Sequence, residues 1–101
     1  MAKSKKRLRS NIKNTQQRIV VVSYSYDETF EFWLAPIGFR NKEVVSIVEG
    51  DSLEELHERV LEELNSNPVF KGSTVSYGID NLNTSEVKRT EIALFFAEKN
   101  I

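Results

Sequence analysis

The fold is decided by residues 44–64, which read VVSIVEGDSLEELHERVLEEL. The first five residues are mostly β-branched and predict a strand. Asp51 can accept hydrogen bonds from the open first turn of a helix, and Glu54, three residues later, completes a capping box. Apolar residues then recur at helical spacing and form one stripe, made of Leu53, Leu56, Val60, Leu61 and Leu64. The stretch therefore predicts a strand followed by an amphipathic helix that covers a sheet.

Two further strands are expected before this unit. Residues 19–26 read IVVVSYSY, a β-branched run followed by alternation of serine and tyrosine, and Asp27 with Glu28 makes a turn. The next strand has Phe30, Phe32 and Leu34 on the face beneath the helix. Trp33 would lie on the other face with Glu31, and Pro36 is expected to end this strand or confine it to an edge.

Two more strands are expected after the helix, which Asn65 to Pro68 should end. Residues 74–79 alternate apolar and polar side chains, and residues 80–83 form a turn. Residues 91–97 place Ile92, Leu94 and Phe96 on one face of a last strand. The predicted order is β-β-β-α-β-β over residues 19–101, an α+β domain of two layers with a single helix packed on an antiparallel sheet.

The charge of the chain is divided unequally along its length. Residues 1–18 contain seven basic residues and no acidic residue, whereas residues 19–101 hold the other seven of the 14 basic residues and all 15 acidic ones. The first segment is thus a basic N-terminal arm, which we expect to be disordered when free because it has few apolar residues. Its cations are Lys3, Lys5, Lys6, Arg7, Arg9, Lys13 and Arg18.

A cationic arm on an acidic body favours a polyanionic partner. The leading hypothesis is a non-catalytic accessory protein whose arm binds nucleic acid (RNA or DNA) or a nucleoprotein assembly. Lys6 to Arg9 would also resemble a nuclear localisation signal in a eukaryotic protein. The competing interpretation of the arm is a solubilising tail, or one that folds back on the acidic helix.

The helix supplies a second hypothesis from a different class. Glu54, Glu58 and Glu62 form a column at i, i+4 spacing, with Glu55 beside it and Arg59 as the one basic residue nearby. This face would dock a basic protein or imitate a phosphate backbone, as in an inhibitor or adaptor of a mobile element or phage. An exposed Trp33 would add to it, although core packing is favoured for the aromatic residues between positions 24 and 39. The alternative is an ordinary solvated helix face.

Catalysis, metals and cofactors have little support in the sequence. Cysteine is absent, which excludes disulfides and thiol chemistry, and His57 is the single histidine. His57 lies at the edge of the apolar stripe, so partial packing is favoured over a catalytic role. The turn at Asp80, Asn81 and Asn83 lacks the spacing of a calcium loop. We therefore expect no enzyme, no cofactor and no metal site.

No apolar run approaches the roughly 20 residues that span a membrane. The expected location is the cytoplasm, or the nucleus if the protein is eukaryotic.

Overall fold

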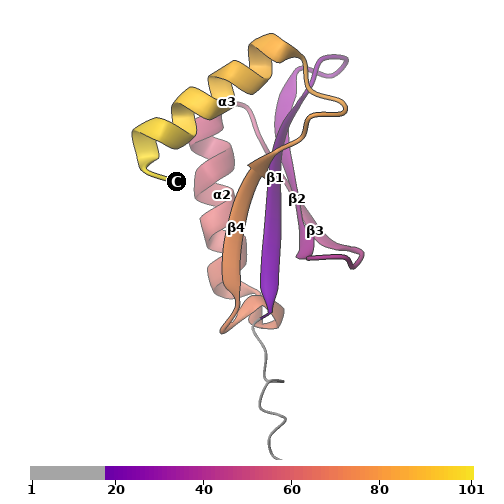
Figure 1. The fold of residues 1–101 in the computed structure, drawn as a ribbon, viewed down its shortest axis with the longest axis vertical. Coiled ribbons are helices and arrows are strands. Elements are labelled where there is room, and N and C mark those ends of the chain that lie inside the picture. The colour runs from indigo at the N-terminus through magenta and orange to yellow at the C-terminus, as the bar shows by residue number, and fades with distance from the viewer. Residues whose placement is uncertain (1–17) are drawn as a thin grey trace, which may run out of the picture.

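The computed structural model describes residues 18–101 and confirms the α+β class. The strands and helices follow one another in the order β-β-β-α-β-α, with a short 3-10 turn, η2, after the first helix (Figure 1). The elements are β1 (Ile19–Asp27), β2 (Phe32–Phe39), β3 (Val44–Gly50), α2 (Leu53–Ser66), η2 (Pro68–Phe70), β4 (Thr74–Ile79) and α3 (Glu86–Lys99).

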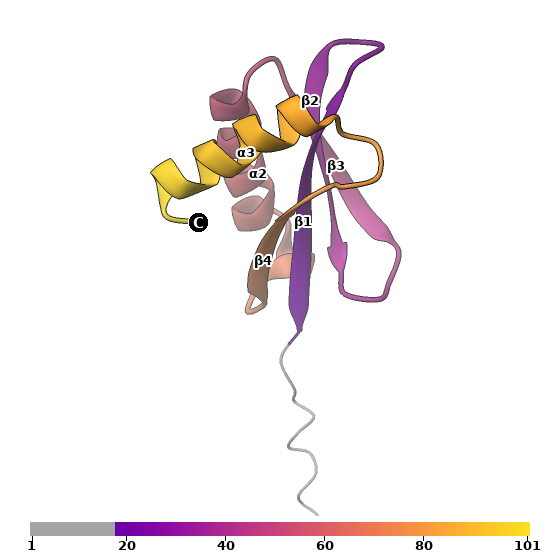
Figure 2. The ribbon, with the colours of Figure 1, turned by 45° about the horizontal axis from the view of Figure 1, so that its top comes forward.

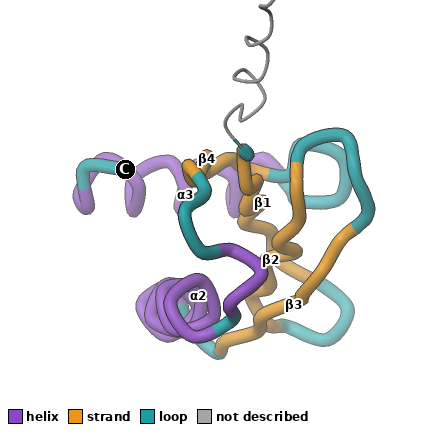
Figure 3. The backbone as a smooth tube through the Cα atoms, turned by 90° about the horizontal axis from the view of Figure 1, so that it is seen from below, coloured by secondary structure: helices purple, strands orange, loops and turns teal. Residues whose placement is uncertain are grey.

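The sheet has the strand order β3-β2-β1-β4 and is mixed rather than wholly antiparallel. The β1–β2 and β2–β3 pairs are antiparallel, but β4 runs parallel to β1, with Ile19 opposite Thr74 and Tyr24 opposite Ile79. The direction changes because α2 carries the chain back along the sheet before β4 begins, as a crossover connection does. Both helices lie on the same side of the sheet, and no helix formed by residues 18–101 covers the other side (Figure 2; Figure 3).

The predicted last strand at residues 91–97 is wrong, because this segment lies within α3. Ser85 caps the helix by accepting a hydrogen bond from the backbone N–H of Lys88 at 3.3 Å, and Asn100 ends it with a positive φ of 60°. The buried residues are Ile92 and Phe95, which are one helical turn apart. Leu94 is 66% exposed, so the alternation that suggested a strand does not correspond to burial.

The expected orientation of β2 is also wrong, by one residue. Trp33, Ala35 and Ile37 are buried on the helix-covered face, whereas Phe32 and Leu34 alternate with them and lie on the other face. Phe30 belongs to the preceding turn, where Asp27 Oδ1 accepts its backbone N–H at 3.0 Å, and its side chain is 75% exposed. A shift of the register by one residue moves every side chain of the strand to the opposite face.

Pro36 lies in the interior of β2, between two neighbouring strands, and not at an edge or a strand end as expected. The Cα register of β1 and β2 pairs Val22 with Ile37 and resumes at Ser25 with Leu34. The pairing is therefore interrupted at Pro36, which has no N–H to donate to a ladder. On its other side Pro36 lies opposite Ile47 of β3.

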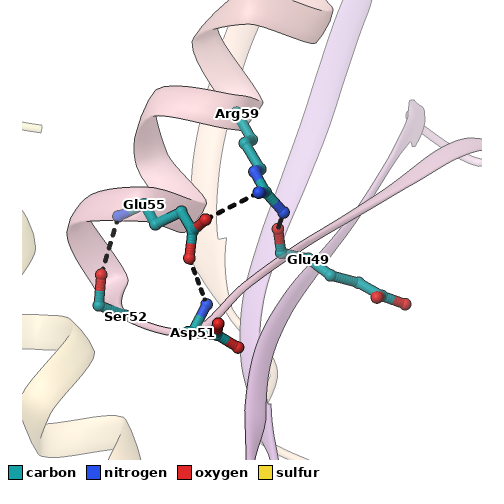
Figure 4. A network of polar contacts seen from close by, with 5 residues as sticks. All are labelled: Glu49, Asp51, Ser52, Glu55 and Arg59. Atoms are coloured by element: carbon teal, nitrogen blue, oxygen red, sulfur yellow. Dashed lines mark hydrogen bonds and ion pairs between the residues drawn. The ribbon is translucent and has the colours of Figure 1, made fainter.

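The junction between β3 and α2 differs in detail from the capping box expected at Asp51 and Glu54. The N-cap is Ser52, whose Oγ accepts from the backbone N–H of Glu55 at 3.1 Å. Glu55 Oε1 in turn accepts from the backbone N–H of Asp51 at 2.7 Å (Figure 4). The helix therefore begins one residue later than the sequence suggested, with the same reciprocal arrangement.

One hydrophobic core lies between the sheet and the two helices. Val20, Val22 and Tyr24 of β1 are fully buried against Leu56 and Val60 of α2. Phe70 of η2 and Ile92 and Phe95 of α3 complete it at the two ends. This core fixes the strand ends, and hence the loops between them, in a defined arrangement.

Candidate nucleic-acid interface

Six of the seven arm cations lie outside the described residues, and Arg18 is the one whose place is known. These six are Lys3, Lys5, Lys6, Arg7, Arg9 and Lys13. The Arg18 carbonyl accepts from the backbone N–H of Thr74 at 3.0 Å, so the arm meets the body where β1 and β4 begin. The Arg18 guanidinium lies over the ring of Phe39, 4.5 Å from its centroid, and Nη2 donates to the Val69 carbonyl at 3.2 Å.

Three cations of the body lie at this same end of the sheet. The backbone N–H of Arg40 donates to the Ile19 carbonyl at 2.9 Å, and Lys42 follows in the β2–β3 turn. Lys71 directly follows η2, three residues before Thr74. All are exposed, as is Arg18. We call Arg18, Arg40, Lys42 and Lys71 the basic pole.

The charges of the basic pole are not neutralised by the ion pairs of residues 18–101. Those ion pairs join Arg59 to Glu55 and Lys88 to Glu91, both elsewhere on the body. The sequence did not reveal the pole, because its cations come from positions 18, 40, 42 and 71 and are brought together by the sheet topology. An indication was available in Arg40-Asn41-Lys42, two cations in one short turn.

An open groove of about 1140 Å³ begins at the pole, and we call it the basic groove. Apolar side chains contribute to its lining, and Val44, Val45 and Val69 are 55%, 45% and 40% exposed. The β2–β3 turn and Arg18 add three cations and the carboxylate of Glu43. The full lining is Arg18, Ile19, Phe39, Arg40, Asn41, Lys42, Glu43, Val44, Val45 and Val69.

The acidic face of α2 is smaller than the sequence suggested. Glu54, Glu58 and Glu62 are exposed, as expected for a column on the outer side of the helix. Glu55, however, caps the helix and pairs with Arg59 at 2.7 Å. Arg59 also donates from Nη1 to the Glu49 carbonyl at 2.9 Å and so joins α2 to β3 (Figure 4). Glu55 is therefore part of the framework of the fold.

Glu63 has a similar role at the far end of α2. Its Oε2 accepts from Ser46 Oγ at 2.6 Å and from Asn67 Nδ2 at 2.9 Å. These two hydrogen bonds, that from Ser46 foremost, hold the pKa of the Glu63 carboxyl below its usual range. Glu63 thus holds α2 against β3 through Ser46, and it is not a free carboxylate of the acidic face.

Trp33 does not extend the acidic face, because it is 6% exposed and belongs to the core. Its ring packs edge-on against Tyr26, with 4.6 Å between the ring centroids. The ammonium of Lys88 lies over both rings, 4.3 Å from the Tyr26 centroid and 5.1 Å from that of Trp33. Core packing of this residue, the favoured interpretation, is observed, although on the opposite face of the strand.

His57 is packed at the edge of the core against aromatic rings. Its Nδ1 lies 2.6 Å from Tyr24 Oη, and its ring contacts Phe95 edge-on. Burial, and then the charge of Lys99, lower the pKa of His57, while burial raises the pKa of the Tyr24 hydroxyl. Both groups are thus favoured in their neutral forms, and a Tyr24 hydroxyl that donates to Nδ1 pairs with the tautomer that carries its proton on Nε2. The arrangement agrees with a packed boundary residue.

The polar turn at residues 80–83 is held by its own side chain. Asp80 Oδ1 accepts from the backbone N–H of Leu82 at 2.8 Å and of Asn83 at 3.4 Å, as in an Asx turn. Within residues 18–101 there is no group of three histidine, aspartate or glutamate side chains placed to hold a metal ion.

Comparisons of the chain with protein-family models, curated proteins and solved structures gave no match. In the part of the chain that the structure describes, neither α2 nor α3 has the length and apolar character of a membrane span.

Proposed function

We propose that the protein is a non-catalytic accessory protein that binds nucleic acid, or a nucleoprotein assembly, through the basic arm and the basic pole. The observation that carries this proposal is the position of the junction between them. The arm joins the body at Arg18, beside Arg40, Lys42 and Lys71. The cations of the arm would therefore act beside those of the pole on the same partner.

The basic and acidic residues of the body are concentrated at opposite ends of its strands, which supports the same proposal. The end of the sheet farthest from the pole carries the β1–β2 turn, with Asp27, Glu28 and Glu31, and the start of α2, with Asp51 and Glu54 (Figure 1). Lys88 also lies there, over Tyr26 and Trp33, so carboxylates outnumber this cation. A polyanion attracts the pole and repels this acidic end. The protein would therefore approach nucleic acid with the arm first and keep its acidic end in solvent.

Binding of this kind rests on neutralised phosphates and is strongly dependent on salt. Each cation that neutralises a phosphate adds about 0.9 to the slope of log affinity against log salt for B-DNA and about 0.7 for a single strand. The matching location is the cytoplasm, or the nucleus in a eukaryotic cell, where nucleic acid is accessible.

The test compares two full-length variants that lose the same charge at different places. Arg40→Gln with Lys42→Gln removes two cations of the pole, and Lys88→Gln with Lys99→Gln removes two from α3. Fluorescence anisotropy with labelled DNA and RNA oligonucleotides across a salt series gives affinity and slope. The pole variant should bind more weakly, with a slope smaller by about two. The α3 variant should retain the wild-type slope.

Equal losses in the two variants would attribute binding to net charge alone and remove the pole from the interface. Absence of binding by the wild type at about 50 mM salt, where phosphate contacts are strong, would end the proposal. A third full-length variant carries glutamine at the six other arm cations, Lys3, Lys5, Lys6, Arg7, Arg9 and Lys13. It measures the share of the arm in the same assay.

A second candidate function rests on the exposed column of Glu54, Glu58 and Glu62. These three carboxylates lie outside the hydrogen bonds and ion pair that occupy Glu55 and Glu63. They would dock a basic protein, in the manner of an inhibitor or adaptor. If this second function is the right one, substitution of all three glutamates by lysine should abolish docking of the basic protein. The same substitutions should leave nucleic-acid binding undiminished.

A further inference from the structure

We propose that the basic groove binds the unpaired bases of a single-stranded nucleic acid. The inference rests on the proposed function and names its substrate class. The groove adjoins the basic pole, since Arg18, Arg40 and Lys42 belong to both. A strand held by its phosphates at the pole therefore has its bases within reach of the groove.

The first observation is a planar cation held over an aromatic ring. The guanidinium of Arg18 lies 4.5 Å from the centroid of Phe39, and its hydrogen bond to the Val69 carbonyl fixes its orientation. The Phe39 ring is supported from the core by Phe70, with 5.7 Å between the centroids. Guanidinium planes and aromatic rings are the surfaces on which proteins stack unpaired bases. Arg18 and Phe39 thus form a supported stacking surface in the groove.

The second observation is the apolar lining beside those cations. Val44, Val45 and Val69 are each at least 40% exposed although they lie among charged residues. A double helix presents phosphates and sugars on its outside and keeps the faces of its bases stacked within, so it has little to place against these valines. A single strand exposes base faces together with phosphates. The exposed valines and the three cations of the groove, which outnumber the one carboxylate of Glu43, match both parts of a single strand.

The size of the groove allows this occupant. Its volume of about 1140 Å³ is slightly above the roughly 300–1,000 Å³ of most small-molecule sites. The groove is also open to solvent, so a chain can enter and leave it. The contacts offered here recognise stacking surface and backbone charge and do not read base identity, so binding should be tolerant of sequence.

The experiment uses the full-length protein and four labelled probes at one salt concentration. Three are 12-nucleotide strands of equal backbone length: oligo(dT), oligo(U) and an abasic DNA strand without bases. The fourth is a 12-base-pair DNA duplex. Stacking of one or more bases should make the base-bearing strands bind about tenfold more tightly than the abasic strand. They should also bind more tightly than the duplex, and the stronger of oligo(dT) and oligo(U) identifies DNA or RNA as the preferred source.

A pair of matched variants places the effect in the groove. Val44→Ser with Val69→Ser removes apolar surface from the groove, whereas Val87→Ser with Leu94→Ser removes exposed apolar side chains from α3. The groove variant should prefer oligo(dT) over the abasic strand less strongly than the wild type does, because Arg18 and Phe39 remain but the apolar lining beside them is lost. The α3 variant should keep the wild-type preference. Circular dichroism confirms that both variants are folded.

Three outcomes would overturn the inference. Equal affinity for the abasic and base-bearing strands would mean that phosphates alone are bound, and the proposed function would survive without base recognition. Tighter binding of the duplex would assign double-stranded nucleic acid to the pole. An unchanged preference in the groove variant would place base recognition elsewhere. If none of the probes binds, the proposed function fails together with this inference.

Discussion

The hydrogen bond between Tyr24 and His57 gives the sharpest test of the interior of the fold. Replacement of Tyr24 by phenylalanine removes one oxygen from a fully buried side chain and keeps its ring contact with Phe96, at 4.9 Å between centroids. The loss is therefore the 2.6 Å hydrogen bond to His57 Nδ1, without a cavity of any size. A hydrogen bond of this kind contributes about 0.5–1.5 kcal/mol net.

The expected cost lies near the middle of that range, about 1 kcal/mol, because His57 is half-buried and solvent can replace part of the lost bond. For a domain of this length, 1 kcal/mol lowers the melting temperature by about 4–8 °C. Circular dichroism melting at pH 7.5 measures it. The control is Tyr77→Phe, in the same aromatic cluster, whose hydroxyl makes no hydrogen bond within residues 18–101.

A second measurement follows the His57 ring by NMR as the pH is lowered. Burial and Lys99 lower the pKa of His57, and a Tyr24 hydroxyl that donates to Nδ1 would favour the neutral ring further. The pKa of His57 should therefore rise in Tyr24→Phe and stay the same in Tyr77→Phe. A Tyr24→Phe protein that melts with the wild type and has an unchanged His57 pKa would refute the hydrogen bond.

Two further predictions concern the strand-to-helix junction and the pH dependence of stability. A Cβ on Gly50 would lie 2.6 Å from the backbone N of Leu56, so Gly50→Ala must displace α2 from β3 and should cost about 1–3 kcal/mol or more in urea unfolding; stability equal to that of the wild type would contradict this packing. The pKa of His57 in the folded protein is below its ordinary 6.5, so the unfolded chain binds more protons as the pH falls. The contribution of neutral His57 to the stability of the fold is therefore complete above about pH 6.5 and is lost as the pH falls through the folded pKa. The urea midpoint should therefore fall between pH 7.5 and pH 5.5, and less so in His57→Asn; a variant with the same decline would place its cause elsewhere.

The parts of the fold that could be predicted from sequence are those fixed by local signals. The β-branched runs at residues 19–22 and 44–48 form strands because their side chains suit a pleated surface. The apolar stripe of α2, with the serine and glutamates before it, determines the helix almost to the residue. The packed state of His57 followed from its place at the edge of that stripe.

The errors arose where a local pattern fits two structures. Ile92, Leu94 and Phe96 alternate as in a strand, but Ser85 and Asn100 cap a helix across the same residues. In β2, the length of the turn at Asp27 decided which face of the strand is buried, and the alternation alone could not set that register. Pro36 can lie inside the sheet because the pairing between β2 and β1 is interrupted at this position.

The candidate site could be predicted only in part, since its cations are dispersed in the sequence. The arm is evident in the sequence as a segment with seven basic residues and no acidic residue, and Arg18 is part of it. Arg40, Lys42 and Lys71 reach the same end of the body because β4 pairs with β1 in parallel and the β2–β3 turn closes beside it. That parallel pairing depends on the path of α2 over the sheet, a property of the assembled fold.

The most direct test of the central claim is an NMR titration of the full-length, ¹⁵N-labelled protein with oligo(dT). Within residues 18–101, the largest amide shifts should fall at the basic pole and along the groove, from Phe39 to Val45 and at Val69. They should decrease with added salt, since phosphate contacts supply much of the affinity. The largest shifts at Glu54, Glu58 and Glu62, or none in the body at saturation, would contradict it.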